Sequence, residues 1–237
     1  MSKKYAVLWC ANYSNSAPLK TQMINILTAN GESWHLLDPM APNFEEQAYG
    51  YDGYVISGSA HSVTDTDSPL VNKVLRFLCE IRERSHAPVV GICFGAQAIA
   101  HAYGGQVKAN RSGLLRLGVE SLTWTQEGKR LIAPQERLEV AIAQSHFESV
   151  HVLPGDAQVL AGSATTENEI FLVAHRYLGI QGHPEIDNNT LSDVFLAFHR
   201  TEMDEKSLQA AKAEAERPLQ VATVIGLIQR ILEEGAL

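Results

Sequence analysis

A cysteine flanked by glycines is the first feature of this chain that could do chemistry. In "VVGICFGAQ", Cys93 lies two residues after Gly91 and two residues before Gly95, between an apolar run and a segment of helical period. A strand that ends in glycine-x-nucleophile-x-glycine and turns at once into a helix holds the nucleophile in a strained conformation at the end of the sheet. The helix N-terminus favours the reactive thiolate. The stretch therefore predicts a nucleophilic Cys93, with a cysteine that merely packs in a βα turn as the alternative.

A base and an orienting carboxylate lie further along the chain. In "GIQGHPEI", His183 and Glu185 are separated by one proline, and in an extended strand their side chains leave the same side of the backbone. One imidazole nitrogen can then bind Glu185 while the other faces Cys93, provided that the strands before the two residues are neighbours. The N–H of Phe94 would point at the oxyanion that forms when a carbonyl is attacked. The alternative is a surface turn with an incidental histidine and glutamate.

The segments around these residues alternate between strand and helix patterns. Short aliphatic or β-branched runs occupy residues 4–10, 33–38, 51–59 and 87–92, and segments of helical period occupy residues 17–31 and 68–86. This alternation is typical of βαβ units and predicts an α/β fold, in which helices cover both faces of a doubly wound, mostly parallel sheet.

The pattern changes after Gly105. Strand-like pieces at 115–124, 137–146, 157–164 and 169–185 follow one another with little helix between them, and we expect them to add antiparallel strands at one edge of the sheet. The rest is predicted to be a helical tail from about 190 to 237, whose last helix packs an apolar face on the body. Nothing marks a domain boundary, so we expect a single domain over residues 1–237.

The composition of the chain argues against several classes of binding partner. The chain has 237 residues, 45% of them hydrophobic, and a formal net charge of -8 at pH 7, which disfavours nucleic acid and anionic membrane surfaces. Neither a long apolar span nor a signal-cleavage pattern appears, so a cytoplasmic protein is expected. Cys10 and Cys79 fit no disulfide or zinc pattern and are expected to be buried. Cysteine–histidine catalysis requires no metal or organic cofactor, so none is expected, and neither a P-loop nor a dinucleotide fingerprint occurs in the sequence.

Together, "GICFGAQ" and "GIQGHPE" resemble the class I glutamine amidotransferase family, with a pattern like that of GMP-synthase glutaminase domains. The resemblance implies a flavodoxin-like core, a Cys93-His183-Glu185 triad, and hydrolysis of a γ-glutamyl amide through a thioester. It also implies that the N–H of Gly58 or Ser59, in "SGSA", joins that of Phe94 in the oxyanion hole.

The resemblance further implies contacts to the glutamyl moiety. Gln97 matches a position that helps to hold this moiety, and "SHFE", with Ser145, His146 and Phe147, matches a segment whose backbone receives its α-amino and carboxylate groups. A structural histidine at the end of a strand is the alternative for His146.

Three departures from the family pattern stand out. The loop reads Gly58-Ser59-Ala60 instead of Gly-Gly-Pro, "HFE" replaces His-Gly-Asp, and Gly182 stands where a bulky residue commonly precedes His-Pro-Glu. The last change is expected to widen the pocket on the leaving-group side. With its helical tail, the chain is more similar to the stand-alone γ-glutamyl peptidases of plants than to synthetase-coupled glutaminases.

The sequence thus predicts a cysteine-dependent enzyme that hydrolyses a γ-glutamyl peptide, a γ-glutamyl amine conjugate or glutamine, releasing glutamate and an amine. One alternative is a glutaminase subunit that delivers ammonia to a separate synthetase partner. A second alternative is a non-catalytic binding or regulatory module with the same fold. An α/β-hydrolase with a cysteine nucleophile fits less well, because that family places its acid before its histidine.

Overall fold

The computed structural model describes residues 2–11, 16–132 and 135–237. Within these ranges the strands are β1 (Lys4–Leu8), β2 (Ser33–Leu37), β3 (Gly53–Ile56), β4 (Val89–Ile92), β5 (Gln106–Ala109), β6 (Arg116–Trp124), β7 (Val140–His146), β8 (Glu148–Val152), β9 (Ala157–Gly162), β10 (Ile170–Val173) and β11 (Tyr177–Ile180). The helical segments are α1 (Ala17–Leu27), α2 (Phe44–Gln47), α3 (Pro69–Arg84), α4 (Phe94–Ala102), α5 (Gln126–Leu131), α6 (Asn188–Thr190), η1 (Leu191–Leu196), α7 (Ala197–His199), η2 (Arg200–Glu202), α8 (Glu205–Ala215) and α9 (Ala222–Glu234).

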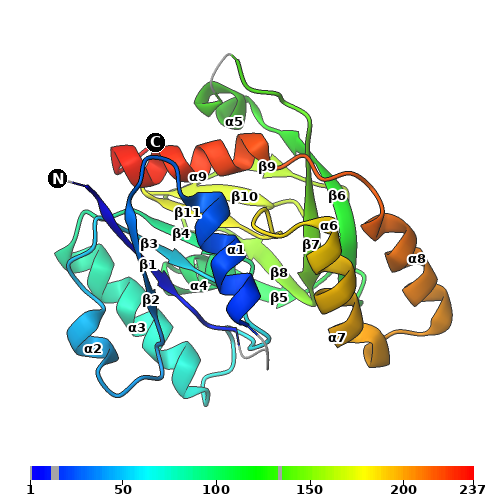
Figure 1. Ribbon diagram of the computed structural model, residues 1–237, viewed down its shortest axis with the longest axis horizontal. Helices are drawn as coiled ribbons and strands as arrows, with labels where there is room; N and C mark the ends of the chain where they lie inside the picture. Colours follow the sequence, from blue (N-terminus) through cyan, green and yellow to red (C-terminus); the bar gives the residue numbers. More distant parts are fainter. Residues whose placement is uncertain (1, 12–15, 133–134) are drawn as a thin grey trace.

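Nine strands form the central sheet, in the order β2-β1-β3-β4-β11-β10-β9-β6-β7 (Figure 1). The pairs from β2 to β11 are parallel, and the pairs from β11 to β7 are antiparallel. β5 and β8 pair separately as a two-stranded antiparallel sheet. The predicted α/β fold, with antiparallel strands added at one edge, is confirmed.

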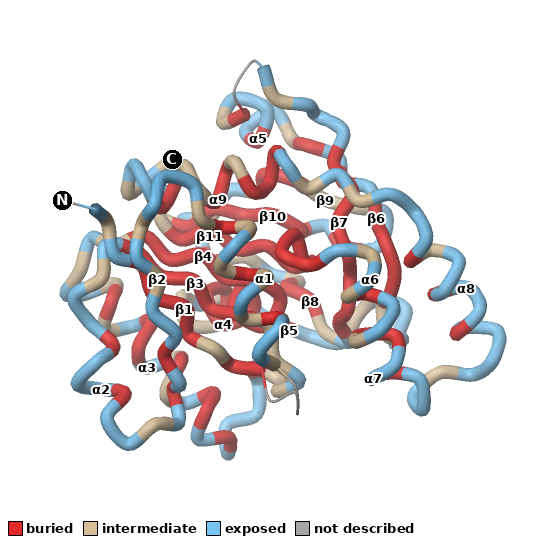
Figure 2. Tube along the Cα trace, in the orientation of Figure 1, coloured by how far each residue is buried: buried red, intermediate tan, exposed pale blue. Residues whose placement is uncertain are grey.

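Helices cover both faces of the sheet. On one face α3 and α4 pack against the strands, with Val71, Phe77 and Ile99 in the core. On the other face α1 and α9 do so, with Met23 and Ile228 buried. Figure 2 shows the buried strands between these two layers. β3 and β4 are buried along their whole length, which explains why their sequences are continuous apolar runs rather than alternating ones.

The C-terminal tail is helical, as predicted. The apolar face expected for the last helix comprises Val221, Val224, Ile225, Ile228, Ile231 and Leu232. All of these are buried except Val221, which is the partly buried N-cap of α9, and the helix ends where Gly235 adopts a left-handed conformation. Earlier in the tail, η1 and α8 pack on β6 and β7 in a third apolar cluster. No helix within the described ranges is long and apolar enough to cross a membrane.

Two expectations about local structure were wrong. The stretch 169–185 is not one strand, because Ala174 and His175, with φ of 48° and 60°, turn the chain back between β10 and β11. Cys10 is buried as expected, but Cys79 is exposed. The buried positions of α3 lie on the face of the helix opposite Cys79, toward the sheet.

Candidate active site

Cys93 lies in a tight turn between β4 and α4. Its φ of 52° and ψ of -106° are unusual for a residue other than glycine. A Cβ on Gly91 would lie 2.3 Å from the carbonyl carbon of Gly95, and a Cβ on Gly95 would lie 2.3 Å from the carbonyl oxygen of Ile56. Real Cβ atoms do not approach backbone this closely, so both glycines are sterically required. The turn places Cys93 at the carboxyl end of the sheet and the N-terminus of α4.

His183 reaches Cys93 through the neighbouring strand. β11 pairs in parallel with β4, with Ile180 opposite Ile92, so the residues that follow the two strands lie at the same edge. The backbone N–H of His183 donates to Ala143 at 2.7 Å. The loop after β3 packs against both His183 and Cys93, because a Cβ on Gly58 would lie 2.9 Å from His183 Cε1 and 3.6 Å from Cys93 Cβ.

Glu185 holds the histidine from the other side. His183 Nδ1 and Glu185 Oε1 are 2.7 Å apart, and both side chains are buried. His183 forms a single β-bridge to Ala143, and the chain turns at residues 184–185. The pair therefore meets in a turn rather than along the extended strand that the sequence suggested. His183 Nε2 is buried and has no hydrogen-bond partner among the described residues, so this nitrogen is available to a reacting atom.

The electrostatics favour a charged imidazole. Burial works against the imidazolium, but the negative charges of Glu185 and Cys93 outweigh it and raise the pKa of His183 to about 10. A protonated histidine can donate a proton to a leaving amine. In the ground state the Cys93 Sγ lies 3.7 Å from the carbonyl oxygen of Ser145.

Within the described ranges, three backbone N–H groups in the segments next to Cys93 have no acceptor. Among the described residues, no acceptor engages the backbone N–H groups of Gly58, Ser59 or Phe94. Phe94 is the first residue of α4, where helix N–H groups have no partner within the helix. The Ser59 side chain is turned away, because its hydroxyl donates to the carbonyl of Cys10 at 2.8 Å. These N–H groups are the kind of donors that stabilise an oxyanion.

A cavity of about 410 Å³ opens over this group, which lies within the usual size of small-ligand sites. Cys93 and His183 line it, and so do the four residues predicted to contact substrate, which are Gln97, Ser145, His146 and Phe147. Phe198, His199 and Glu202 also line it, and the sequence analysis missed them. The spacing of His199 and Glu202, which places them on one face of a helix, is the signal that could have found this pair.

Two of the residues predicted to contact substrate, Gln97 and His146, form hydrogen bonds to other residues of the protein. Gln97 Nε2 donates to the carbonyl oxygen of Glu148 at 2.8 Å. Both ring nitrogens of His146 lie 3.1 Å from side-chain oxygens, those of Asn110 and Gln144. Burial lowers the pKa of His146 to about 4. His146 thus fits the structural alternative better than direct substrate contact.

Gly182 does not widen the cavity, contrary to expectation. A Cβ at this position would lie 2.5 Å from Ile142 Cδ1 and 2.7 Å from Gln144 Nε2. Side chains of β7 therefore fill the space that a larger residue would take, and Gly182 lets β7 approach His183.

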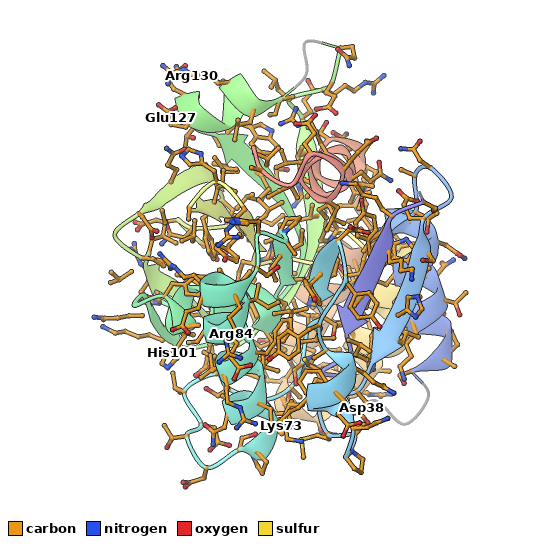
Figure 3. All side chains as sticks on the ribbon, turned by 90° about the vertical axis from the view of Figure 1, so that its left-hand side faces the viewer. Asp38, Lys73, Arg84, His101, Glu127 and Arg130 are labelled. Atoms are coloured by element: carbon orange, nitrogen blue, oxygen red, sulfur yellow. The ribbon has the colours of Figure 1, made fainter. Side chains whose placement is uncertain are left out.

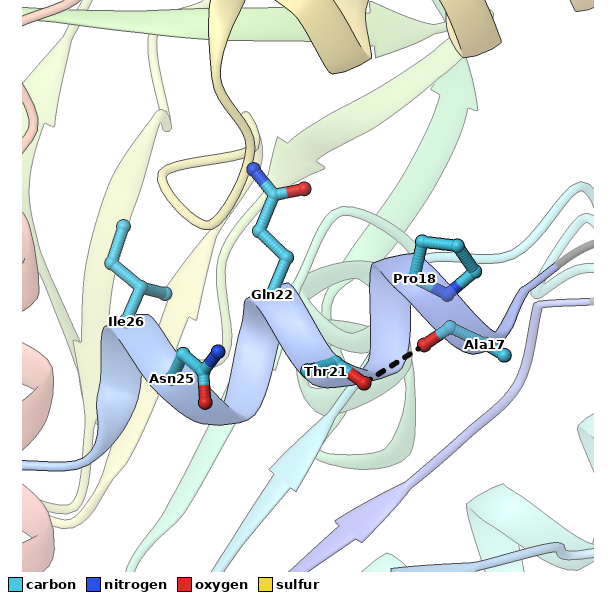
Figure 4. A pocket seen from close by; sticks show the side chains of 6 residues that line it. All are labelled: Ala17, Pro18, Thr21, Gln22, Asn25 and Ile26. Atoms are coloured by element: carbon cyan, nitrogen blue, oxygen red, sulfur yellow. Dashed lines mark hydrogen bonds between the residues drawn. The ribbon is translucent and has the colours of Figure 1, made fainter.

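A second hollow, on α1, offers no comparable chemistry. It is lined by Ala17, Pro18, Thr21, Gln22, Asn25 and Ile26, which carry no titratable side chain (Figure 4). Arg84 and Arg130, which are labelled in Figure 3, are exposed to solvent. No group of three or more potential metal ligands occurs within the described ranges.

Behind the cavity, Glu169 is a fully buried carboxyl. It accepts hydrogen bonds from Gln144 Nε2 and from the Ser163 hydroxyl, which lies at 2.9 Å. Burial raises the pKa of Glu169 from 4.5 to about 7. Between these values the folded state binds more protons than the unfolded state, so its stability decreases as the pH rises.

We expect Glu169→Gln to remove this pH dependence. The raised pKa corresponds to about 3 kcal/mol, so wild-type stability relative to the variant should fall by roughly that amount between pH 4.5 and 7 and then stay level. Urea unfolding at a series of pH values measures the difference, with Glu216→Gln, at an exposed residue, as the control. Stability curves that run parallel for wild type and Glu169→Gln would contradict the assignment.

The chain is similar to known proteins over most of its length. The model of the family "Glutamine amidotransferase class-I" matches residues 15–201. The chain belongs to this family. Within it, γ-glutamyl peptidase 4 of Arabidopsis thaliana is 33% identical over 180 residues, which cover 72% of this chain and 69% of the peptidase.

Two further proteins are similar to this chain. The glutamine-hydrolysing GMP synthase of Porphyromonas gingivalis is 32% identical over 143 residues, which are 60% of this chain but only 26% of that enzyme. The crystal structure of a glutamine amidotransferase from Thermotoga maritima superposes with a TM-score of 0.73 at 19% identity, and covers 99% of both chains. This likeness establishes the shared α/β fold, and family membership and the peptidase relatives support a hydrolase-type enzyme.

Proposed function

We propose that this class I amidotransferase homologue hydrolyses a γ-glutamyl amide bond by covalent cysteine catalysis. The observation that carries the proposal is that Cys93 and His183 line one cavity and that Glu185 binds His183 Nδ1 from behind, with His183 Nε2 buried and unpartnered among the described residues. In this arrangement Glu185 orients the imidazole, His183 transfers the proton and Cys93 is the nucleophile.

The first half of the reaction forms a thioester. The Cys93 sulfur attacks the γ-carbonyl carbon, and the resulting oxyanion accepts hydrogen bonds from the Phe94 N–H and from the N–H of Gly58 or Ser59. His183 then gives its Nε2 proton to the amide nitrogen as the C–N bond breaks, so the amine leaves in neutral form.

The second half releases glutamate. With Nε2 now unprotonated, His183 takes a proton from a water molecule, and the hydroxide equivalent attacks the thioester carbonyl. The C–S bond breaks, and the site returns to the thiolate and imidazolium. Each step uses only the three side chains, the backbone and water.

The stand-alone hydrolase is favoured over a synthetase-coupled glutaminase. Its support is the coverage of γ-glutamyl peptidase 4, which is similar over 69% of its own length, against 26% for GMP synthase. The similarity to GMP synthase nevertheless supports a second candidate function, in which a separate synthetase partner receives ammonia.

The test is glutamate release from a substrate panel. Purified protein is assayed with glutamine, γ-glutamyl dipeptides and γ-glutamyl alkylamides. Under the proposal, one class of conjugate is cleaved with a kcat/KM at least tenfold above that of glutamine. Preference for glutamine, with turnover that rises when a synthetase is added, would instead support the second function. Absence of turnover with every compound and partner would overturn both.

A further inference from the structure

Glu185 has a second carboxylate oxygen that does not bind His183. Oε1 lies 2.7 Å from His183 Nδ1, whereas Oε2 is buried and has no hydrogen-bond partner among the described residues. Leaving a buried carboxylate oxygen without a partner is costly, so such atoms are nearly always hydrogen-bonded in folded proteins. The second oxygen also matters for orientation, because a carboxylate that is held at one oxygen alone can pivot about that hydrogen bond.

Trp9 has a buried donor with the complementary need. It is the residue that follows β1, and within the described ranges its indole Nε1 is buried without a hydrogen-bond partner. An indole N–H only donates and a carboxylate oxygen only accepts. Because the two atoms are not bonded to each other directly, a group that joins them must both accept from Trp9 and donate to Glu185.

Trp9 and Glu185 line the same small cavity, which has a volume of about 20 Å³ and also touches Ser57 and His183. Roughly 10–15 Å³ is enough to hold one water molecule, provided that several polar groups bind it. Apart from Gly58, the rest of the wall consists of the apolar residues Ala11, Leu19, Met23, Ile186 and Phe195. A cavity of this size therefore admits a single water molecule and excludes a γ-glutamyl compound.

Ser57 offers a third polar contact in this cavity. Its hydroxyl accepts from the backbone N–H of Cys10 at 2.8 Å and donates to the carbonyl oxygen of Gly58 at 3.0 Å. A hydroxyl oxygen has two lone pairs, so one of them is left to accept. A water molecule that accepts from Trp9 and donates to Glu185 and Ser57 makes about three hydrogen bonds, which is typical of buried water.

We propose that one buried water molecule bridges Trp9 Nε1 to Glu185 Oε2, and that Trp9 is thereby a positioning residue for His183. The bridge fixes the second oxygen of the carboxylate, so Oε1 stays on His183 Nδ1 and the imidazole keeps its orientation. Trp9 does not line the substrate cavity, and it lies before the segment that matches the family model. The inference rests on the proposed function and deepens it, since it names a further residue on which proton transfer by His183 depends.

Trp9→Phe should lower kcat about tenfold and leave KM unchanged. Phenylalanine keeps an aromatic ring but has no N–H, so the variant removes the donor of the bridge. The expected loss is of the order that one hydrogen bond to a charged group contributes. KM should not change, because Trp9 lies outside the substrate cavity. Glutamate release from the best substrate of the panel, over a range of substrate concentrations, gives both constants.

Trp34→Phe is the matched control. The indole Nε1 of Trp34 is likewise buried without a partner in the part of the chain that the structure describes, but Trp34 lines neither of the two cavities. This variant removes the same N–H from a partly buried tryptophan and should keep the wild-type kcat. Equal kcat values for Trp9→Phe and Trp34→Phe, or a loss in Trp9→Phe that lies in KM alone, would overturn the positioning role.

Two measurements that need no turnover separate this proposal from the proposed hydrolysis. A high-resolution crystal structure of the protein should show one water molecule within about 3.2 Å of both Trp9 Nε1 and Glu185 Oε2. In protein labelled with ¹⁵N-tryptophan, Glu185→Gln should shift the indole N–H resonance of Trp9 and leave that of Trp34 in place.

The outcomes distinguish the bridge from the reaction. A dry cavity, or a Trp9 resonance that does not respond to Glu185→Gln, would overturn the bridge even if hydrolysis is established. A bridging water together with a responsive resonance would support the bridge even in a protein that cleaves none of the γ-glutamyl compounds, and only the proposed hydrolysis would then fail.

Discussion

Cys93→Ala is expected to abolish hydrolysis of the best substrate, with kcat lowered on the order of 10⁵-fold or more. The proposed reaction requires a covalent bond from Sγ to the γ-carbonyl carbon, and alanine has no atom that can form it. His183 and the backbone donors could still bind the amide, but they would act on it without a nucleophile. Stopped or continuous assays of glutamate release, with protein free of wild-type contamination, measure the loss.

The structure of the variant should persist. Alanine carries the same Cβ as cysteine, so the strained backbone at φ 52° is neither relieved nor worsened. Cys79→Ala, at an exposed thiol on α3, is the matched control and should retain full activity. Turnover by Cys93→Ala that equals the turnover of Cys79→Ala would refute cysteine catalysis at this site. An equal loss of activity in both variants would refute it too, because the loss would then not be specific to Cys93.

Gly91→Ala is expected to destabilise the protein by about 4 kcal/mol or more, a size seen when a substitution forces strain into a packed core. The new Cβ would lie 2.3 Å from the carbonyl carbon and oxygen of Gly95 and 2.6 Å from the nitrogen of Ala96. These are backbone atoms at the start of α4, and α4 cannot move outward without lifting Phe94 and Cys93 away from the sheet.

Thermal unfolding measures the effect. For a chain of this size about 4 kcal/mol corresponds to a decrease in Tm of roughly 10 °C, and activity should fall at temperatures where the variant remains folded. Gly155→Ala is the control, because no atom lies within 4 Å of the Cβ that it would introduce. A Gly91→Ala variant with the Tm and activity of Gly155→Ala would show that the turn tolerates a side chain.

Gly91 and Gly95, on either side of Cys93, show which part of the site could be predicted from the sequence. Gly95 is required by the approach of Ile56 on β3, which the chain brings there from a distance, whereas the clash at Gly91 involves atoms only four and five residues away in the chain, so this glycine is a local requirement of the turn. The same holds for the alternation of apolar runs and helical segments, which follows from the periods of strand and helix. Local sterics and periodicity are properties of neighbours in sequence.

Contacts between segments that are distant in sequence could not be predicted in this way. The expected neighbourhood of His183 and Cys93 depended on β11 lying beside β4, which no local pattern could guarantee. The sequence also suggested an extended strand through His183 and Glu185, whereas their pairing occurs in a turn that is anchored on Ala143 of β7. Cys79 and Gly182 were misjudged for a similar reason, since their surroundings depend on which face of α3 and which side chains of β7 are nearby.

By itself, then, the sequence determined the α/β fold, the turn at Cys93 and the choice of His183 and Glu185 as its candidate partners. Only the tertiary structure decided what else shares the cavity. His199 and Glu202 lie in a tail whose helical pattern indicates packing. His199 reaches Ser145, with Glu202 bound to its other ring nitrogen, because η1 and α8 bury their apolar faces on β6 and β7. That placement depends on the docking of whole elements, which the burial of apolar surface drives and no short stretch of residues encodes.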